Sequence, residues 1–147
     1  MIIYVDMDDV LCNYQKAHKA ALEKNSLTKY PQSQKGFFEN LEPNAGALEA
    51  VTFLREHFDV YILTAPSTRN PLSYTEKRLW VEKYFAYEFT KKLILCSNKG
   101  LLKGDLLIDD HVSGKGQEAF EGRLIHFGSE DFPDWKTVSE WVKGQLL

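Results

Sequence analysis

The sequence predicts one α/β domain: a Rossmann-like three-layer sandwich around a five-stranded parallel sheet, with a small cap inserted. Short apolar runs recur along the 147 residues, and helical segments separate most of them. Strands that alternate with helices are typical of a parallel sheet covered by helices. Polar side chains follow most of the runs, where a sheet of this class places its ligand site. We therefore assign residues 1–147 to a single domain, which is an ordinary domain length.

The predicted strands are runs of four or five residues rich in Val, Ile, Leu and aromatic side chains. They cover residues 2–5, 60–63, 93–96, 105–108 and 123–127. Runs of this length and composition, bounded by polar residues, indicate buried strands.

The predicted helices lie between the strands and after the last one. They cover about 12–25, 43–57, 74–85 and 135–145. Residues 26–40 break the helical pattern, with Pro31 and Gly36 as breakers and with the aromatic residues Tyr30, Phe37 and Phe38. We expect residues 14–42 to form an insertion, the cap, over the edge of the sheet.

The composition excludes several classes of protein. A net charge of −3 and a pI near 5.8 give no support for a nucleic-acid polymer or an anionic membrane as the main partner. Cys12 and Cys96 are far apart and form no CxxC motif, so we expect reduced thiols. We see no signal peptide and no apolar run of the ~20 residues that a membrane span requires. The expected location is the cytoplasm.

Polar groups follow four strands and suit a phosphate or a metal. They are Asp6 and Asp8, Thr64, Lys99, and the pair Asp109 and Asp110. The carboxyl ends of parallel strands meet at one edge of a sheet, and side chains two residues apart point the same way. Carboxylates gathered without a counter-charge repel one another, so a divalent cation is their expected partner.

Each of these residues also has an ordinary structural explanation. Asp6 and Asp8 can be surface acids, Thr64 a helix cap, Lys99 a solvated side chain, and Asp109 a turn residue. One such residue would indicate little, whereas polar groups of this kind after four strands predict a site for a phosphate or a metal.

The set resembles the haloacid dehalogenase superfamily of phosphotransferases. Its four motifs match Asp6 and Asp8, then Thr64, then Lys99, then the acidic pair at 109–110. Within that superfamily the chain is most similar to the 5'(3')-deoxyribonucleotidases. Segments 6–11, 37–43, 80–85 and 105–110 carry this closer likeness.

The resemblance implies a phosphomonoesterase that forms an aspartyl-phosphate intermediate. Asp6 is the expected nucleophile. Asp8 is expected to protonate the leaving alkoxide and then to take a proton from water. Thr64 would bind phosphate oxygens, and Lys99 would place a positive charge against the phosphate.

The resemblance also implies a Mg²⁺ cofactor. Its expected ligands are the carboxylates of Asp6 and Asp110 and the backbone carbonyl of Asp8. Asp109 supports the metal or binds it through water, so the choice between the two paired acids stays open.

The expected substrate-binding residues are Tyr14, Phe38, Ala65 and Arg69. Tyr14 and Phe38 fall where the nucleotidases hold the base between rings, although core packing explains such aromatic residues equally well. Arg69 follows Thr64 in a loop and can reach the phosphate or the sugar, or can simply be solvated.

Two departures from the family pattern stand out. Asp9 occupies a position that is usually glycine, and Asp tolerates the unusual backbone angle there better than most residues. The cap is short, so the pocket is expected to be open, and a neighbouring subunit could cover it. Homo-oligomerisation stays open at this point.

The leading prediction is therefore a Mg²⁺-dependent 5'(3')-nucleotidase acting on a small-molecule substrate, a nucleoside monophosphate. One alternative keeps the chemistry and changes the substrate to another small phosphate ester. Another is a catalytically silent module that binds phosphate.

Overall fold

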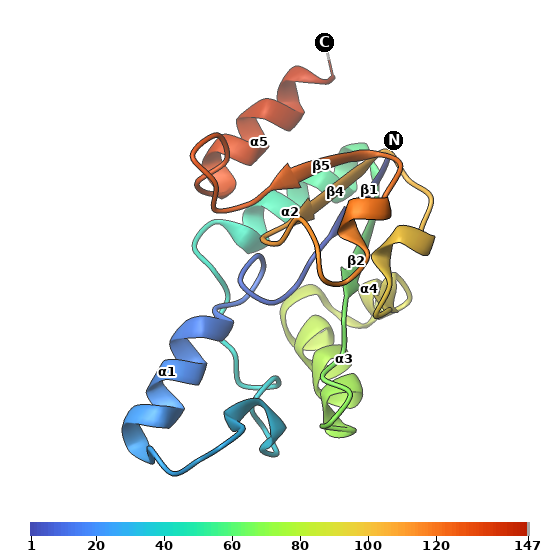
Figure 1. Ribbon diagram of the computed structural model, residues 1–147. Helices are drawn as coiled ribbons and strands as arrows, with labels where there is room; N and C mark the ends of the chain where they lie inside the picture. The colour runs from blue at the N-terminus through green and yellow to red at the C-terminus, as the bar shows by residue number, and fades with distance from the viewer. Residues whose placement is uncertain (147) are drawn as a thin grey trace.

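The computed structural model describes residues 1–146 and contains an all-parallel sheet with the strand order β3-β2-β1-β4-β5 (Figure 1). The predicted five-stranded parallel sheet is confirmed. The strands are β1 (Ile2–Val5), β2 (Asp59–Thr64), β3 (Leu93–Leu95), β4 (Leu106–Asp109) and β5 (Arg123–His126). β1 lies at the centre, so the residues that follow it project from the middle of the carboxyl edge.

Five α-helices and three short 3₁₀-helices connect the strands. The α-helices are α1 (Tyr14–Lys24), α2 (Ala47–His57), α3 (Leu72–Phe85), α4 (Tyr87–Thr90) and α5 (Trp135–Gly144). The 3₁₀-helices are η1 (Pro31–Ser33), η2 (Lys99–Leu101) and η3 (Gln117–Ala119). The helix predicted from residue 43 begins later, at Ala47, because Gly46 adopts a left-handed conformation with φ of 77°.

The layers that cover the two faces of the sheet differ in thickness. Alternate strand residues, among them Val5 and Ile62, pack into the larger core with side chains from α2, α3 and α5. Their neighbours, among them Tyr4 and Leu63, pack on the other face into a smaller cluster with Phe120 and residues near η2. The third layer is therefore thin, made of η2, η3 and loops, and it holds part of the site.

A glycine permits the close approach of η2 and η3. Gly116 has φ of 83°, and a Cβ atom there would lie 2.0 Å from Oδ1 of Asn98. Asn98 in turn accepts a hydrogen bond from the amide of Gly100 at 3.2 Å. This contact fixes the segment that carries Lys99.

Residues 14–42, which include α1 and η1, extend away from the sheet (Figure 1). The segment is attached to α3 and the loop before it. The Asn70 side chain donates to the carbonyl of Gln32 at 2.9 Å, and the Trp80 indole donates to the carbonyl of Leu41 at 2.8 Å. These two contacts, one part-buried and one buried, hold the segment against α3 and the loop before it.

Two further features of the structure are the state of its cysteines and the length and polarity of its helices. Cys12 and Cys96 are both free thiols. Across residues 1–146, every helix is too short or too polar to cross a membrane.

Candidate active site

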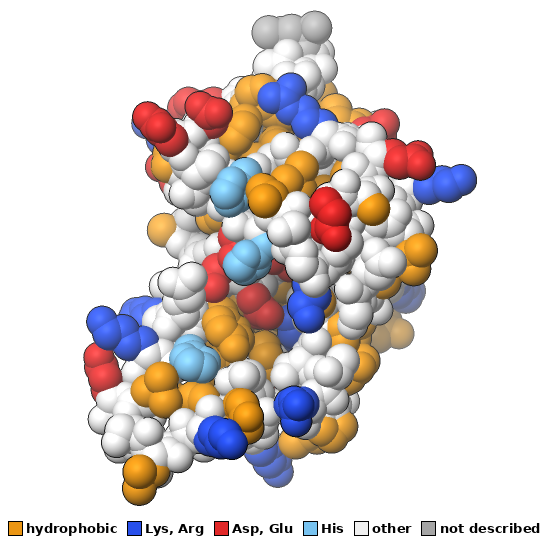
Figure 2. Space-filling view, viewed as in Figure 1, with side chains coloured by type: hydrophobic (Ala, Val, Ile, Leu, Met, Phe, Trp, Pro, Cys, Tyr) orange, Lys and Arg blue, Asp and Glu red, His pale blue; other side chains and the backbone are white. Residues whose placement is uncertain are grey.

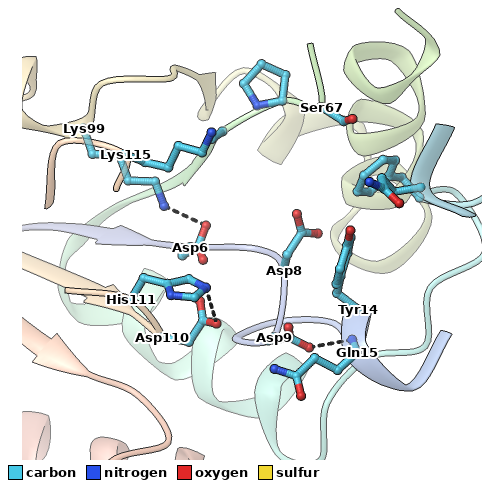
Figure 3. Close-up of a pocket in the computed structure, with 14 residues that line it drawn as sticks. Asp6, Asp8, Asp9, Tyr14, Gln15, Ser67, Lys99, Asp110, His111 and Lys115 are labelled. Carbon is cyan, nitrogen blue, oxygen red and sulfur yellow. Dashed lines mark hydrogen bonds and ion pairs between the residues drawn. The ribbon is translucent and has the colours of Figure 1, made fainter. Parts of the chain in front are cut away.

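Asp6 and Asp8 follow β1 directly and line the same pocket (Figure 3). A tight turn forms behind them, in which the amides of Val10, Leu11 and Cys12 all donate to the carbonyl of Met7. The turn requires a left-handed residue, and Asp9 supplies it with φ of 61°. The expected unusual backbone angle at Asp9 is confirmed.

Lys99 connects two of the acids in a buried cluster. Its ammonium group lies 2.8 Å from Oδ1 of Asp6 and 2.6 Å from Oδ2 of Asp109, and only 2% of the side chain is exposed. The alternative of a solvated lysine is therefore excluded. Burial disfavours the charged form of Lys99, but the attraction of the two carboxylates outweighs it, and the pKa of Lys99 lies above its ordinary value.

Burial is also the main influence on Asp6. It raises the pKa of Asp6 well above the ordinary value, the nearby charges of Asp109 and Asp8 act in the same direction, and Lys99 opposes them. A second positive charge beside Asp6 would therefore favour the ionised form that a nucleophile needs.

Asp109 and Asp110 have different surroundings. Asp109 is fully buried and accepts hydrogen bonds from Lys99, from the backbone of His111 and from the side chain of Gln117. Asp110 has a buried Oδ1 atom without a hydrogen-bond partner among the described residues. Burial raises the pKa of Asp110 to about 6.

These acids fit a divalent cation. One carboxylate oxygen from each of Asp6, Asp109 and Asp110 lies within 4.8 Å of the others. An uncompensated buried oxygen on Asp110 is what a metal ligand leaves when no metal is bound, and carboxylate oxygen is the donor that hard cations prefer. Since Asp109 already has three partners, Asp110 is the better placed of the two to bind the metal directly.

Sequence reasoning missed Lys77, which forms a second buried ammonium centre. It donates to Oδ2 of Asp8 at 2.8 Å and to Oγ1 of Thr64 at 2.6 Å, and its side chain is fully buried. A signal was present: Lys77 shares the helical spacing of Trp80 and Val81, so it lies on the apolar face of α3. A charged residue on such a face predicts a buried partner.

The pocket beside these centres has a volume of about 400 Å³, which suits a small molecule. Figure 2 shows acidic side chains at the bottom of a hollow, with hydrophobic side chains next to them. Tyr14, Phe38 and Ala65, for which we expect substrate contacts, line this pocket. Phe38 is only 1% exposed, so most of its ring belongs to the core. Arg69 is exposed and does not line the pocket.

The pocket also has lining residues that the sequence did not point to. Gln32 of η1 contributes a buried side-chain oxygen without a hydrogen-bond partner among the described residues. Lys115, an exposed residue in the loop after β4, also lines the pocket (Figure 3). The glycines on both sides of Lys115 were a weak signal for a functional loop, whereas nothing in the local pattern marked Gln32.

Comparison with known sequences decides the family. The profile of the family described as "5' nucleotidase, deoxy (Pyrimidine), cytosolic type C protein" matches residues 22–145. The chain belongs to this family. The match continues past residues 105–110, the last of the segments that carry the likeness described above.

Two named relatives match this chain over more than half of its length. A protein of Vibrio phage KVP40, provisionally named 5'(3')-deoxyribonucleotidase, is 39% identical over 98% of this chain and 85% of its own length. The human 5'(3')-deoxyribonucleotidase, cytosolic type, is 41% identical over 56% of this chain and 42% of its own length.

A solved structure supports the fold independently. A haloacid dehalogenase-like family hydrolase from Xanthomonas campestris superposes with a TM-score of 0.63, covering 98% of this chain and 95% of the other. At 11% identity this likeness concerns the fold alone.

Proposed function

We propose that this protein is a Mg²⁺-dependent phosphomonoesterase that hydrolyses deoxyribonucleoside monophosphates. The observation that carries the proposal is the joining of Asp6, Asp109 and Lys99 in one buried cluster beside an open pocket. Membership of the deoxy-type 5' nucleotidase family supports this substrate class.

In the first half-reaction, a carboxylate oxygen of Asp6 attacks the phosphorus atom. The bond between phosphorus and the ester oxygen breaks, and an aspartyl-phosphate forms. Asp8 gives its proton to the departing oxygen, so the nucleoside leaves as an alcohol. Lys99 and the hydroxyl group of Thr64 bind the phosphate oxygens, where negative charge must be balanced.

In the second half-reaction, water attacks the same phosphorus atom. Asp8 is then ionised and accepts the proton of that water, and the Asp6 carboxylate is released together with inorganic phosphate. Each turnover therefore restores both acids to their starting states.

Asp6, Asp110 and the backbone carbonyl of Asp8 would hold the metal, with Asp109 in support. When bound, Mg²⁺ neutralises phosphate charge and so reduces repulsion between the substrate and the carboxylate nucleophile.

We propose that residues 14–42 act as the cap of a single domain and receive the nucleoside. Tyr14 offers a half-buried ring at the pocket wall, and Gln32 offers a polar group that can contact a base. Arg69 retains a role only if its exposed side chain moves toward the substrate. A neighbouring subunit could complete the open side, and free thiols are consistent with a cytoplasmic location.

Phosphate release from a panel of substrates tests this function. The panel contains 5'- and 3'-deoxynucleotides, the corresponding ribonucleotides, and sugar phosphates, each with Mg²⁺ and with EDTA. We expect the highest kcat/KM for deoxynucleotides, loss of activity in EDTA, and recovery on adding Mg²⁺. Preference for sugar phosphates would replace the substrate assignment, and silence across the panel would contradict the enzyme assignment.

A further inference from the structure

Lys77 has a fully buried ammonium group behind the pocket residue Asp8, and the proposed reaction assigns it no role. It comes from the middle of α3, and its side-chain exposure is 0%. Burying a charge is costly unless the charge is paired and hydrogen-bonded. A lysine at this position therefore needs a specific reason.

Three groups from three different segments surround the Lys77 ammonium. Asp8 after β1 accepts at 2.8 Å, Thr64 at the end of β2 accepts at 2.6 Å, and the Phe38 ring of the cap lies 5.0 Å away. An ammonium group has three N–H bonds, and a ring face attracts a cation. Two hydrogen bonds and one ring contact therefore determine the position of this ammonium group.

The contact with Asp8 fixes one carboxylate oxygen and leaves the other available. Lys77 holds Oδ2, whereas Oδ1 has only the distant thiol of Cys12 at 3.8 Å. A thiol is a weak donor. Asp8 lines the pocket, so with Oδ2 held by Lys77 we expect Oδ1 to be the oxygen that meets the leaving group.

The contact with Thr64 has a similar directional effect. The Thr64 hydroxyl oxygen accepts from Lys77, so its own single proton is free to be donated elsewhere. A phosphate oxygen in the pocket is the acceptor that the proposed reaction places there.

We propose that Lys77 is a positioning residue, which fixes the Asp8 carboxylate so that its Oδ1 faces the leaving oxygen of the substrate. The inference rests on the proposed function. In the reaction, the bond between phosphorus and the ester oxygen breaks while the proton on Asp8 moves to that oxygen. Lys77 does not touch the reacting atoms.

The leaving group offers a test that a merely structural role would not pass. A nucleoside leaves as an alkoxide and needs the proton from Asp8, whereas p-nitrophenolate is a stable anion and leaves without one. The first turnover after rapid mixing with Mg²⁺ isolates this step from the later hydrolysis. The variant is Lys77→Met, which keeps the length of the side chain and removes its charge and donors.

We expect Lys77→Met to slow the first turnover of a 5'-deoxynucleotide by about 10²-fold, since a positioned general acid contributes 10²–10⁴-fold. The first turnover of p-nitrophenyl phosphate should slow by less than about 5-fold, from the weaker hold on Thr64. Lys83→Met, an exposed site on the same helix, is the matched control and should leave both rates unchanged.

Equal slowing of both substrates, or a rise in KM with kcat unchanged, would overturn the positioning role. If Lys77→Met fails to fold by circular dichroism, Lys77→Gln provides the same comparison, because it keeps a donor without the charge. Absence of phosphate release by the unaltered protein would instead refute the proposed function, so the two failures are distinguishable.

Discussion

Two buried lysines divide the site into two halves. Lys99 lies between Asp6 and Asp109 and serves the side where the nucleophile and the metal belong. Lys77 lies between Asp8 and Thr64 and serves the side of the leaving group. Lys99 comes from the short η2 segment, whereas Lys77 comes from the middle of a long helix. Two carboxylates two residues apart thus receive separate positive partners, which suits two different chemical roles.

The largest effect should come from the nucleophile. Asp6→Asn keeps the shape of the side chain but cannot form an aspartyl-phosphate, so turnover should fall by about 10⁴-fold or more. Phosphate release from a deoxynucleotide measures the loss, and circular dichroism checks the fold. Undiminished turnover in this variant would remove the covalent mechanism.

Loss of Lys99 should lower the activity toward nucleotides and toward p-nitrophenyl phosphate alike. Lys99→Met removes a charge that balances phosphate and the nucleophile, so kcat/KM should fall by about 10²–10³-fold for nucleotides and for p-nitrophenyl phosphate. The variant also leaves Asp6 and Asp109 buried without a positive partner, which typically costs about 3–5 kcal/mol of stability. Chemical denaturation measures that cost.

The matched control for this variant is Lys103→Met, which changes an exposed lysine close to η2. Both its stability and its activity should equal those of the unaltered protein. If Lys99→Met lost activity toward nucleotides only, that result would contradict the division of roles between the two lysines.

Asp110 should link metal, pH and stability. Its pKa is raised from 3.8 to about 6 by burial, so the metal-free folded state binds its proton more tightly than the unfolded state does. The resulting stabilisation is present below about pH 4 and is lost as the pH rises through about 6, a change on the order of 2 kcal/mol. Thermal unfolding in EDTA across this range measures it.

Mg²⁺ should reverse this trend, because it binds the ionised carboxylates. We expect added Mg²⁺ to raise the melting temperature near pH 7 and to have little effect below pH 5. In Asp110→Asn the metal-induced rise should largely disappear, and the metal-free protein should lose less stability on going from pH 5 to pH 7. A full response to Mg²⁺ in this variant would exclude Asp110 as a ligand.

The smallest effect concerns the base. Tyr14→Leu removes a half-buried ring from the pocket wall, and stacking on an aromatic ring contributes about 1–3 kcal/mol per base. KM should rise roughly 10-fold for deoxynucleotides and stay unchanged for p-nitrophenyl phosphate. An equal change for both would assign Tyr14 to packing. Phe38 is a poorer choice for this test, because a core ring that is 1% exposed also carries stability.

The sequence correctly predicted the sheet and the residues at its carboxyl edge, because both follow from where the strands lie and end. Strands that alternate with helices predicted the parallel sheet, and the edge rule placed Asp6, Thr64 and Asp109 at one end of it. Lys77 was missed because a lysine inside a helix is usually solvated, and only its register with Trp80 indicated burial. Contacts of the cap, such as Asn70 with Gln32, depend on how two distant segments meet, which no local pattern specifies.

The assignment of Asp6 as nucleophile and Asp8 as general acid is tested most directly by the first turnover of p-nitrophenyl phosphate in Asp8→Asn. Without an acid, this variant should still release one p-nitrophenolate per active site in a rapid burst, because that leaving group needs no proton. The same variant should release almost no nucleoside from a deoxynucleotide, and Asp6→Asn should give no burst with either substrate. Loss of the burst in Asp8→Asn, or a burst in Asp6→Asn, would contradict the assigned roles.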